Sequence, residues 1–409
     1  MPDTLAHPGF RAHRDFRARP DFRAHRDFRA RVAAFAAAGL TFTPLAATPA
    51  SAEPAPVAAC GGAWTRTATP SPGSIGTILL DVAATTATQS WAVGYRAYED
   101  AQGMFAVSPI IERWDGSTWV LASKPAAPGQ LAGAFALAAD DVWAVGHSGL
   151  ESPDYQPLIE HWDGSSWRHV PSPDAPTGYL LAIGGSAPDD LWAAGMLIGS
   201  YETVIEHWDG SAWSLVPHPS PVSDYVAIGG VAAASSDDVT IVGTYLRDGV
   251  NAPFALHWDG SAWRRTHPRS DGTDGTSLTD VTARASGRVW AVGSYASADG
   301  VTHPLAQRWT GRRWVSSDPA PRDSSASFAS VTAGPAGLWA VGSQTSDDAT
   351  RTMTQRWRAS SHEWVDTHSP NAKGDSALLA ANESDAGEVW AVGYSVAGPV
   401  QRSLAMHRC

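Results

Sequence analysis

Short runs rich in apolar residues recur along this chain, and turn residues separate one run from the next. Between Tyr179 and His218 there are four such runs, at 180–183, 191–195, 204–208 and 213–216. Runs of this length bounded by Asp, Gly and Ser predict β-strands, and the Asp-Gly pair before the last run is typical of a tight hairpin turn. The segment is therefore expected to form a sheet of four short strands.

Tryptophan marks the same unit throughout the chain. All 19 tryptophans fall at three positions of one repeat, and successive W-A-V-G phrases are 48 to 52 residues apart. One position opens that phrase, with Thr240 where the tryptophan is missing, and the other two open and close the phrase W-D-G-S-x-W. The three sets are Trp91, Trp143, Trp192, Trp290, Trp339 and Trp390; Trp114, Trp162, Trp208, Trp258, Trp309 and Trp357; and Trp64, Trp119, Trp167, Trp213, Trp263, Trp314 and Trp364. A period of this length is typical of propellers and solenoids.

A four-stranded sheet of this kind cannot bury both of its faces alone, so we expect the repeats to stack radially. Seven closing tryptophans and seven second-strand phrases predict an all-β, seven-bladed β-propeller with four-stranded blades. The N-terminal strand that begins at Trp64 is expected to complete the last blade, whose other three strands span 378–408. Residues 60–409 form the propeller in this scheme.

Residues 1–52 have the character of an export signal with a long, arginine-rich front. The segment Phe10–Arg19 recurs letter for letter at Phe22–Arg31, an uncharged alanine-rich run follows, and residues 50–52 offer the small side chains of a cleavage site. The alanine-rich run is too short and too weakly apolar for a membrane span. The duplicated arginines suit an extended n-region or a misassigned start codon better than nucleic-acid binding. We expect a secreted protein with a short linker at 53–59.

The charge balance excludes one class of partner. The chain carries 29 Lys and Arg against 41 Asp and Glu, and residues 1–52 contribute eight of the basic and four of the acidic residues. The remaining 21 basic and 37 acidic residues give a formal charge of −16, which repels the phosphate backbone of nucleic acids. We therefore expect an extracellular carbohydrate or protein partner, no nucleic acid, no membrane insertion and a monomeric protein.

The two cysteines lie at the two ends of the predicted propeller. When the repeats are aligned, Cys60 and Cys409 both fall on the place that follows the third-strand tryptophan. We predict a Cys60–Cys409 disulfide within the last blade, which suits an exported protein. By the chain-entropy estimate, closing a loop of roughly 350 residues stabilises the fold by at most about 5 to 6 kcal/mol. The alternative is that residues 57–60 form a lipobox, but an acid and two prolines between 53 and 56 separate Cys60 from the apolar run that should precede it.

The repeat resembles the kelch motif of β-propellers, in which a strand ending in glycines is followed by a Tyr-Asp-Pro hairpin and a tryptophan. W-A-V-G takes the place of the first element, W-D-G-S-x-W that of the second, and residues 216–219 that of the proline-bearing exit. The likeness spans Cys60 to Cys409, with one glycine instead of two, Trp in place of Tyr, and a hairpin one residue shorter. The hairpin is also similar to the Asp-box of bacterial glycosidases and assembly factors, with a different Asp-to-Trp spacing. These resemblances imply an architecture and no particular activity.

Strand order sorts the loops into two sides. In an up-and-down blade the loops after strands one and three lie together, which we call the turn side, and the loops after strands two and four form the variable side. The turn side collects near-identical Asp pairs and Asp-Gly hairpins, whereas all nine tyrosines and many acids fall on or beside the variable side. Tyrosine offers rigid contact area with a hydroxyl, and nearby carboxylates accept hydrogen bonds from sugars or basic peptides. We predict ligand contacts at Tyr98, Glu99, Glu151, Asp154, Tyr155, Tyr179, Tyr201, Glu202, Tyr225 and Asp248.

A basic residue precedes the third-strand tryptophan position in every repeat, but these residues do not predict a metal site. Each lies in a different blade, whereas zinc needs its ligands within a few ångströms of one another. The set is Arg113, His161, His207, His257, Arg308, Arg356 and His407. The loop Asp271–Gly275 is the best calcium candidate, although it lacks the alternating oxygen ligands of an EF-hand. We expect no cofactor, with calcium as the one alternative.

The known catalytic patterns argue against several enzymes. The chain has no G-x-S-x-G nucleophile motif. A copper-radical oxidase of the galactose oxidase kind needs a cysteine cross-linked to tyrosine, and both cysteines have another expected role. A sialidase needs converging arginines, but Arg96, Arg247 and Arg402 fall on separate blades. We predict a secreted, non-catalytic module that recognises carbohydrate or protein through its variable side. The alternatives are an extracellular glycoside hydrolase or lyase that uses the carboxylates of that side, and a pure scaffold.

Overall fold

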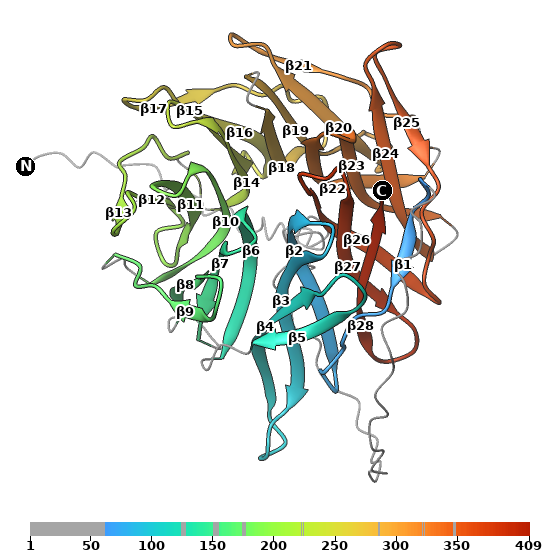
Figure 1. Ribbon diagram of the computed structural model, residues 1–409. Coiled ribbons are helices and arrows are strands. Elements are labelled where there is room, and N and C mark those ends of the chain that lie inside the picture. Colours follow the sequence, from blue (N-terminus) through green and yellow to red (C-terminus); the bar gives the residue numbers. More distant parts are fainter. Residues whose placement is uncertain are drawn as a thin grey trace, which may run out of the picture. The chain divides into compact units, whose positions relative to one another are not determined.

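The computed structural model describes residues 62–409 apart from 124–127, 150–154, 174–176, 222, 224, 285–286, 321, 323 and 347–348. Every helix or strand in this part of the chain is a β-strand, as the sequence predicts (Figure 1). Residues 1–61, which include Cys60, and the predicted ligand residues Glu151 and Asp154 lie outside the described residues.

The strands pair into four-stranded antiparallel units, which we number blade 1 to blade 7. Blade 1 consists of β2 (Gly76–Thr86), β3 (Gln89–Glu99), β4 (Phe105–Trp114) and β5 (Trp119–Ser123). Blade 2 consists of β6 (Gly129–Ala138), β7 (Asp141–Ser148), β8 (Gln156–Trp162) and β9 (Trp167–His169). Blade 3 consists of β10 (Gly178–Ala187), β11 (Asp190–Leu197), β12 (Thr203–Trp208) and β13 (Trp213–Leu215). Blade 4 consists of β14 (Val226–Ser235), β15 (Asp238–Arg247), β16 (Val250–Trp258) and β17 (Trp263–Thr266). Blade 5 consists of β18 (Thr276–Arg284), β19 (Arg288–Ala296), β20 (Thr302–Trp309) and β21 (Trp314–Ser316). Blade 6 consists of β22 (Ser325–Gly334), β23 (Gly337–Ser346), β24 (Ala349–Arg358) and β25 (Glu363–Thr367). Blade 7 is β26 (Asp375–Glu383), β27 (Val389–Val396), β28 (Gln401–Arg408) and β1 (Thr65–Thr67).

Blade 7 takes its outer strand from the other end of the propeller. Strand β1 pairs antiparallel with β28, with Thr65 opposite His407 and Thr67 opposite Ala405. Strand β28 also meets β2 through one parallel pair, Gly76 and Gln401, so blades 7 and 1 together form one eight-stranded sheet. The N-terminal strand therefore completes the last sheet, as the sequence predicts.

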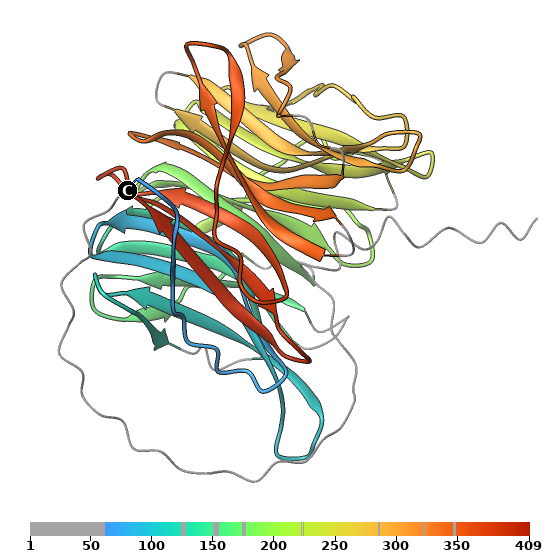
Figure 2. The ribbon, with the colours of Figure 1, turned by 90° about the vertical axis from the view of Figure 1, so that its right-hand side faces the viewer.

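The first strands of the blades contact one another in a closed series. Each of β2, β6, β10, β14, β18 and β22 packs against the next first strand, and β26 packs against β2. Side chains strengthen the series: Asp81 Oδ2 accepts a hydrogen bond from Ala134 N at 2.9 Å, and Asn382 Oδ1 accepts one from Ala84 N at 3.1 Å. In Figures 1 and 2 the sheets are arranged about these strands. The arrangement fits the seven predicted blades.

Three indole rings fill each junction between blades that carries the full repeat. The second-strand tryptophan of one blade lies against both tryptophans of the next blade's hairpin phrase. Trp390 of blade 7 lies 4.9 Å, centroid to centroid, from each of Trp114 and Trp119 of blade 1. The same contact joins Trp91 to Trp162 and Trp167, Trp143 to Trp208 and Trp213, Trp192 to Trp258 and Trp263, and Trp290 to Trp357 and Trp364. This tryptophan wedge therefore also joins the last blade to the first.

Two junctions depart from the tryptophan wedge. Thr240, which is buried, takes the place of the second-strand tryptophan in blade 4. Between blades 6 and 7, Arg408 stands at the third-strand tryptophan position, and its guanidinium carbon lies 4.7 Å from the centroid of Trp339. Trp64 meets the same ring edge-on at 5.8 Å. A cation–π contact thus replaces one indole contact at this junction.

In five blades the basic residue before the third-strand tryptophan position lies against the second-strand tryptophan of its own blade. His161 lies 4.0 Å from the Trp143 ring at an interplanar angle of 21°, and its Nε2 is 2.8 Å from Asp141 Oδ1. The four blades with such a histidine pair it with an acid, as His161 with Asp141, His207 with Asp190, His257 with Asp238 and His407 with Glu388. The three blades with arginine have Gln89, Arg288 or Gly337 in place of the acid. The histidines therefore have a structural partner in four separate blades.

We expect Trp390→Ala to lower the free energy of unfolding by about 3–5 kcal/mol, because the substitution removes a fully buried aromatic ring. Urea denaturation followed by circular dichroism measures the change. Val250→Ala, at an exposed site, is the control and is expected to change stability by less than about 0.5 kcal/mol. A loss below about 1 kcal/mol for Trp390→Ala would contradict the proposed packing.

Candidate functional site

The acids of the turn side are bound to their own hairpins. In blade 2, Asp163 Oδ1 accepts hydrogen bonds from Ser165 N and Ser166 N, each at 2.9 Å, and from Ser165 Oγ at 2.6 Å. These bonds lower the pKa of Asp163. Gly164 has a φ of +86°, and a Cβ there would lie 2.9 Å from the side chain of Asp140, so only glycine fits. The repeated Asp-Gly turns are therefore structural.

The variable side of blades 2 to 4 gathers four of the predicted tyrosines, and we call Tyr155, Tyr179, Tyr201 and Tyr225 the tyrosine cluster. The rings of Tyr155 and Tyr179 meet edge-on with centroids 6.3 Å apart. Burial, together with the neighbouring Tyr155 and Tyr201, raises the pKa of Tyr179 to about 12. Burial and the neighbouring Tyr179 also raise the pKa of Tyr225. Tyr179 and Tyr225 therefore keep their hydroxyl protons at neutral pH.

The tyrosine cluster has a buried base and an exposed tip. Tyr179 lies in the hydrophobic core with 9% of its surface exposed, and Tyr155 and Tyr225 are half-buried. Tyr201 is 45% exposed and has a left-handed φ of 55° in the turn between β11 and β12. Tyr201 is thus the most exposed member of the cluster and the one that a ligand can cover most fully, and Tyr179 is the most buried.

His147 of β7 forms one wall of the tyrosine cluster. Its ring centroid lies 4.4 Å from that of Tyr155 and 6.2 Å from that of Tyr179. Burial lowers the pKa of His147 to about 4, and its Nδ1 has no hydrogen-bond partner among the described residues. His147 is therefore neutral at pH 7 and adds aromatic surface. The sequence analysis missed it because it lies within a strand, directly after the W-A-V-G phrase.

Tyr98 and Glu99 lie apart from the tyrosine cluster, at the end of β3 in blade 1. The guanidinium carbon of Arg96 lies 4.6 Å from the centroid of Tyr98. The β3–β4 hairpin extends beyond the neighbouring strands, in cyan at the bottom of Figure 2, and it exposes Met104 and Phe105. Neither residue was predicted as a ligand contact, although β3 and β4, with 11 and 10 residues, are among the longest strands of the described chain.

Glu202 and Asp248 lie in different blades. Glu202 is exposed beside Tyr201. Burial lowers the pKa of His218, which follows the last strand of blade 3, and the charge of Glu202 opposes this shift. Asp248 is exposed at the tip of the β15–β16 hairpin, with a φ of 52°. Asp248 also lines a hollow of about 440 Å³ on blade 4, together with Tyr245 and two arginines that the sequence analysis did not select as ligand contacts.

Glu112 of β4 is a buried acid that the sequence analysis did not single out. It is fully buried, neither carboxyl oxygen has a hydrogen-bond partner within the described ranges, and burial raises its pKa to about 9. The same repeat position holds Gln307 in blade 5, whose amide binds the main chain of Arg269: Arg269 N donates to Oε1 at 3.0 Å, and Nε2 donates to Arg269 O at 2.8 Å. Glu112 is therefore protonated at neutral pH and closed to solvent.

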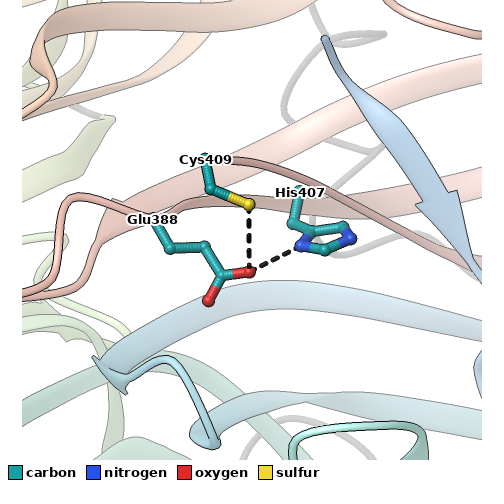
Figure 3. A group of neighbouring side chains, drawn as sticks. All are labelled: Glu388, His407 and Cys409. Carbon is teal, nitrogen blue, oxygen red and sulfur yellow. Dashed lines mark hydrogen bonds and ion pairs between the residues drawn. The ribbon is translucent and has the colours of Figure 1, made fainter. Parts of the chain in front are cut away.

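The acid–histidine pair of blade 7 has a cysteine beside it (Figure 3). Glu388 Oε1 lies 2.6 Å from His407 Nδ1 and 4.0 Å from Cys409 Sγ, and all three groups offer an atom within 4.8 Å of the others. The Glu388–His407 contact repeats the acid–histidine pairs of blades 2 to 4, and Cys409 is not free. The repeat therefore explains the group without a metal ion. The Cys60–Cys409 disulfide stays a prediction, because Cys60 lies outside the described residues.

In the predicted calcium loop, the carboxylate of Asp271 has hydrogen-bond partners within the protein. Asp271 Oδ2 accepts hydrogen bonds from Ser316 Oγ and, at 3.4 Å, from Gln307 Nε2. Its Oδ1 accepts one from Arg269 Nε at 3.2 Å. Calcium binding at this loop stays a prediction.

No protein-family model and no curated protein matches this chain. Solved structures do match it. One is described as YCF48 bound to D1 peptide, with a TM-score of 0.52 and 14% identity over 84% of this chain and 94% of that chain. Another is YCF48 from Cyanidioschyzon merolae, with a TM-score of 0.50 and 12% identity over 85% of this chain and 98% of that chain. At this identity the likeness shows the fold, and the chain is a β-propeller. Among the described residues, no helix has the length and apolar character to cross a bilayer.

The raised pKa of Glu112 leads to a pH-dependent prediction. As the pH rises above 4.5, the unfolded chain loses this proton while the folded chain keeps it to about pH 9, so the carboxyl lowers stability progressively over that range. We expect Glu112→Gln to raise the Tm by a few degrees at about pH 8 and to leave it nearly unchanged at about pH 4.5.

Differential scanning calorimetry at the two pH values measures the effect. Glu202→Gln, at an exposed site, is the control and is expected to leave both Tm values unchanged. A Glu112→Gln protein that is no more stable than the wild type at the higher pH would show that Glu112 has a partner or reaches solvent.

Proposed function

We propose that this chain is a secreted, non-catalytic, seven-bladed β-propeller that binds a segment of a partner protein through its tyrosine cluster. One observation carries the proposal: the exposed Tyr201 is a neighbour of the buried Tyr179 on the side of the propeller where the loops vary. Tyrosine provides a large contact area at low entropic cost and a hydroxyl for hydrogen bonding. The acids of the turn side, by contrast, are already bound within their hairpins.

The geometry favours a protein partner over a sugar. A sugar ring stacks on an open aromatic face, and in the tyrosine cluster Tyr201 alone is exposed, since Tyr155 lies against His147 and Tyr179 is buried. A protein can pack apolar side chains around Tyr201 and hydrogen-bond to its hydroxyl. The solved structure described as YCF48 bound to D1 peptide supports a peptide-binding role for a propeller of this fold. Carbohydrate recognition is the second candidate and an outcome of the test below.

The remaining parts of the proposal have separate support. Seven blades are supported by the closed series of first strands and by the pairing of β1 with β28. Secretion is supported by the signal-like residues 1–52 and by cysteines placed only at the two ends of the propeller.

Tyr201→Asn is the most direct test of the binding surface. Asparagine tolerates the left-handed backbone of this position, so the fold is expected to be unaffected. Ligands are selected from a displayed peptide library and from a glycan array with the wild-type chain. We expect peptides to be selected and Tyr201→Asn to weaken their binding at least about tenfold, with an unchanged Tm.

Leu215→Ala is the matched control, because Leu215 is exposed to the same degree on the outer strand β13. It is expected to keep full peptide affinity. Selection of glycans in place of peptides, or peptide binding that is indifferent to Tyr201→Asn, would contradict the proposal. Turnover of a bound polysaccharide would favour the alternative of a glycoside hydrolase or lyase.

The predicted disulfide is tested independently. Peptide mapping of the secreted protein under non-reducing conditions is expected to recover the peptides of Cys60 and Cys409 as one linked species. Reduction is expected to lower the Tm, because the predicted bond would tie the chain that precedes β1 to the residue that follows its partner strand β28. Recovery of two free thiols, or of a lipid on Cys60, would refute the prediction.

A further inference from the structure

The hollow on blade 4 differs chemically from the rest of this acidic chain. It has a volume of about 440 Å³ and lies between the β15–β16 hairpin and the segment that follows β17. Tyr245, Arg247, Phe254 and Arg265 line it on the strands, and Asp248 and His267 line it from the loops. We call it the blade 4 groove.

Packing holds one cation against the wall of the blade 4 groove. Phe254 is almost fully buried, and its ring meets that of Tyr245 edge-on with centroids 6.4 Å apart. The guanidinium carbon of Arg265 lies 5.8 Å from the Tyr245 centroid. Three side chains from three adjacent strands thus lie in series, with the guanidinium of the exposed Arg265 against the Tyr245 ring beside the hollow.

A tight turn holds the second cation. Asp248 and Gly249 form the two-residue turn of the β15–β16 hairpin, with φ values of 52° and 80°. Positive φ at both turn residues is typical of a type I′ turn, which matches the twist of its strands and is rigid. Arg247 pairs with Val250 at the base of this turn. The hairpin therefore sets the main-chain position of Arg247, whose side chain is 71% exposed.

The two arginines are poorly neutralised by the protein itself. Arg247 has a carboxylate oxygen of Asp248 at 3.9 Å, and both side chains are largely exposed, so the pair contributes little. Arg265 forms no ion pair within the described ranges. The neighbouring Arg264 and Arg269, in contrast, are bound to Asp259 at 2.7 Å and Asp271 at 3.2 Å. The groove therefore holds two available cations in a chain whose formal net charge is −12.

The lining of the groove favours a peptide over an acidic sugar. The Arg265 guanidinium and the Phe254 ring both lie against Tyr245, which leaves little open aromatic face for a sugar ring. Val250 is exposed at the edge, and Pro253 and Pro268 line the hollow, so apolar side chains also find contacts. A peptide can supply carboxylates and apolar groups together.

We propose that the blade 4 groove binds an acidic peptide segment of a partner protein, with carboxylates of that segment on Arg247 and Arg265. This inference rests on the proposed binding function and adds the chemistry of the partner. Tyr245 and the hairpin act as positioning groups for the two cations.

The test uses fluorescence anisotropy with the full chain and labelled twelve-residue peptide pools. One pool contains Asp, Glu, Leu and Tyr, a second has Asn and Gln in place of the acids, and a labelled oligogalacturonate serves as an acidic sugar. We expect the acidic pool to bind at least about tenfold more tightly than the amide pool, and its Kd to rise as NaCl is raised from about 50 to about 300 mM.

The variant R247A/R265A is expected to weaken binding of the acidic pool at least about tenfold, since two charge-assisted hydrogen-bonding groups are lost. R312A, at an exposed arginine on the hairpin of blade 5 on the turn side, is the matched control and is expected to bind normally. Equal binding of the acidic and amide pools, tighter binding of oligogalacturonate, or indifference to R247A/R265A would overturn the inference.

The two proposals fail in distinguishable ways. Peptide binding that is lost in Tyr201→Asn but kept in R247A/R265A overturns the groove and leaves the proposed function standing. Acidic-pool binding that is lost in R247A/R265A but kept in Tyr201→Asn supports the groove and overturns the tyrosine cluster as the binding site. Binding of no peptide overturns both.

Discussion

The packing of indole rings between adjacent sheets is the interaction on which the rest of this structure depends. A four-stranded blade leaves two apolar faces, so it is stable only against its neighbours. Ring contacts of this kind contribute about 0.5 to 1.5 kcal/mol each beyond the burial of area. Where one ring is missing at the junction of blades 6 and 7, Arg408 lies on Trp339 and keeps the ring contact. The junction between blades 7 and 1 uses the same contact, through Trp390.

The same repeat separates the two sides of the molecule. In blades 1 to 4 the turn of the hairpin phrase combines an acid that binds the following amides with a glycine at positive φ, and these turns closely resemble one another. The loops after the second and fourth strands differ more from one another. Residues suited to binding therefore gather there: the tyrosine cluster at blades 2 to 4, the blade 4 groove, and the long hairpin of blade 1.

The sequence predicts the repeating parts well, because each repeat provides an independent observation of the same contact. The spacing of the tryptophans predicted the four-stranded units, and the alignment of Trp64 with the closing tryptophans predicted that β1 completes blade 7. The candidate site was predicted in part. Four of the predicted tyrosines lie together on the variable side, and their role in binding stays a prediction.

The features that were missed depend on contacts between residues distant in sequence. The burial of Tyr179 follows from its place in the core between blades, which no single repeat shows. The availability of Arg265 depends on the absence of a nearby acid in the folded protein, whereas Arg264 next to it is paired. Glu112 has no hydrogen-bond partner among the described residues, whereas Gln307 at the same repeat position binds the main chain of Arg269, which follows the last strand of the preceding blade.

A double-mutant cycle between Trp390 and Trp119 tests most directly whether the indole contacts hold the last blade to the first. The two rings meet edge-on at 4.9 Å across that junction. The free energies of unfolding of both single alanine variants and of the double variant are measured by urea denaturation. We predict a coupling energy of about 1 kcal/mol or more, and additive losses within about 0.5 kcal/mol for the distant pair Trp390 and Trp192. Additive losses for Trp390 and Trp119 as well would contradict this account of the fold.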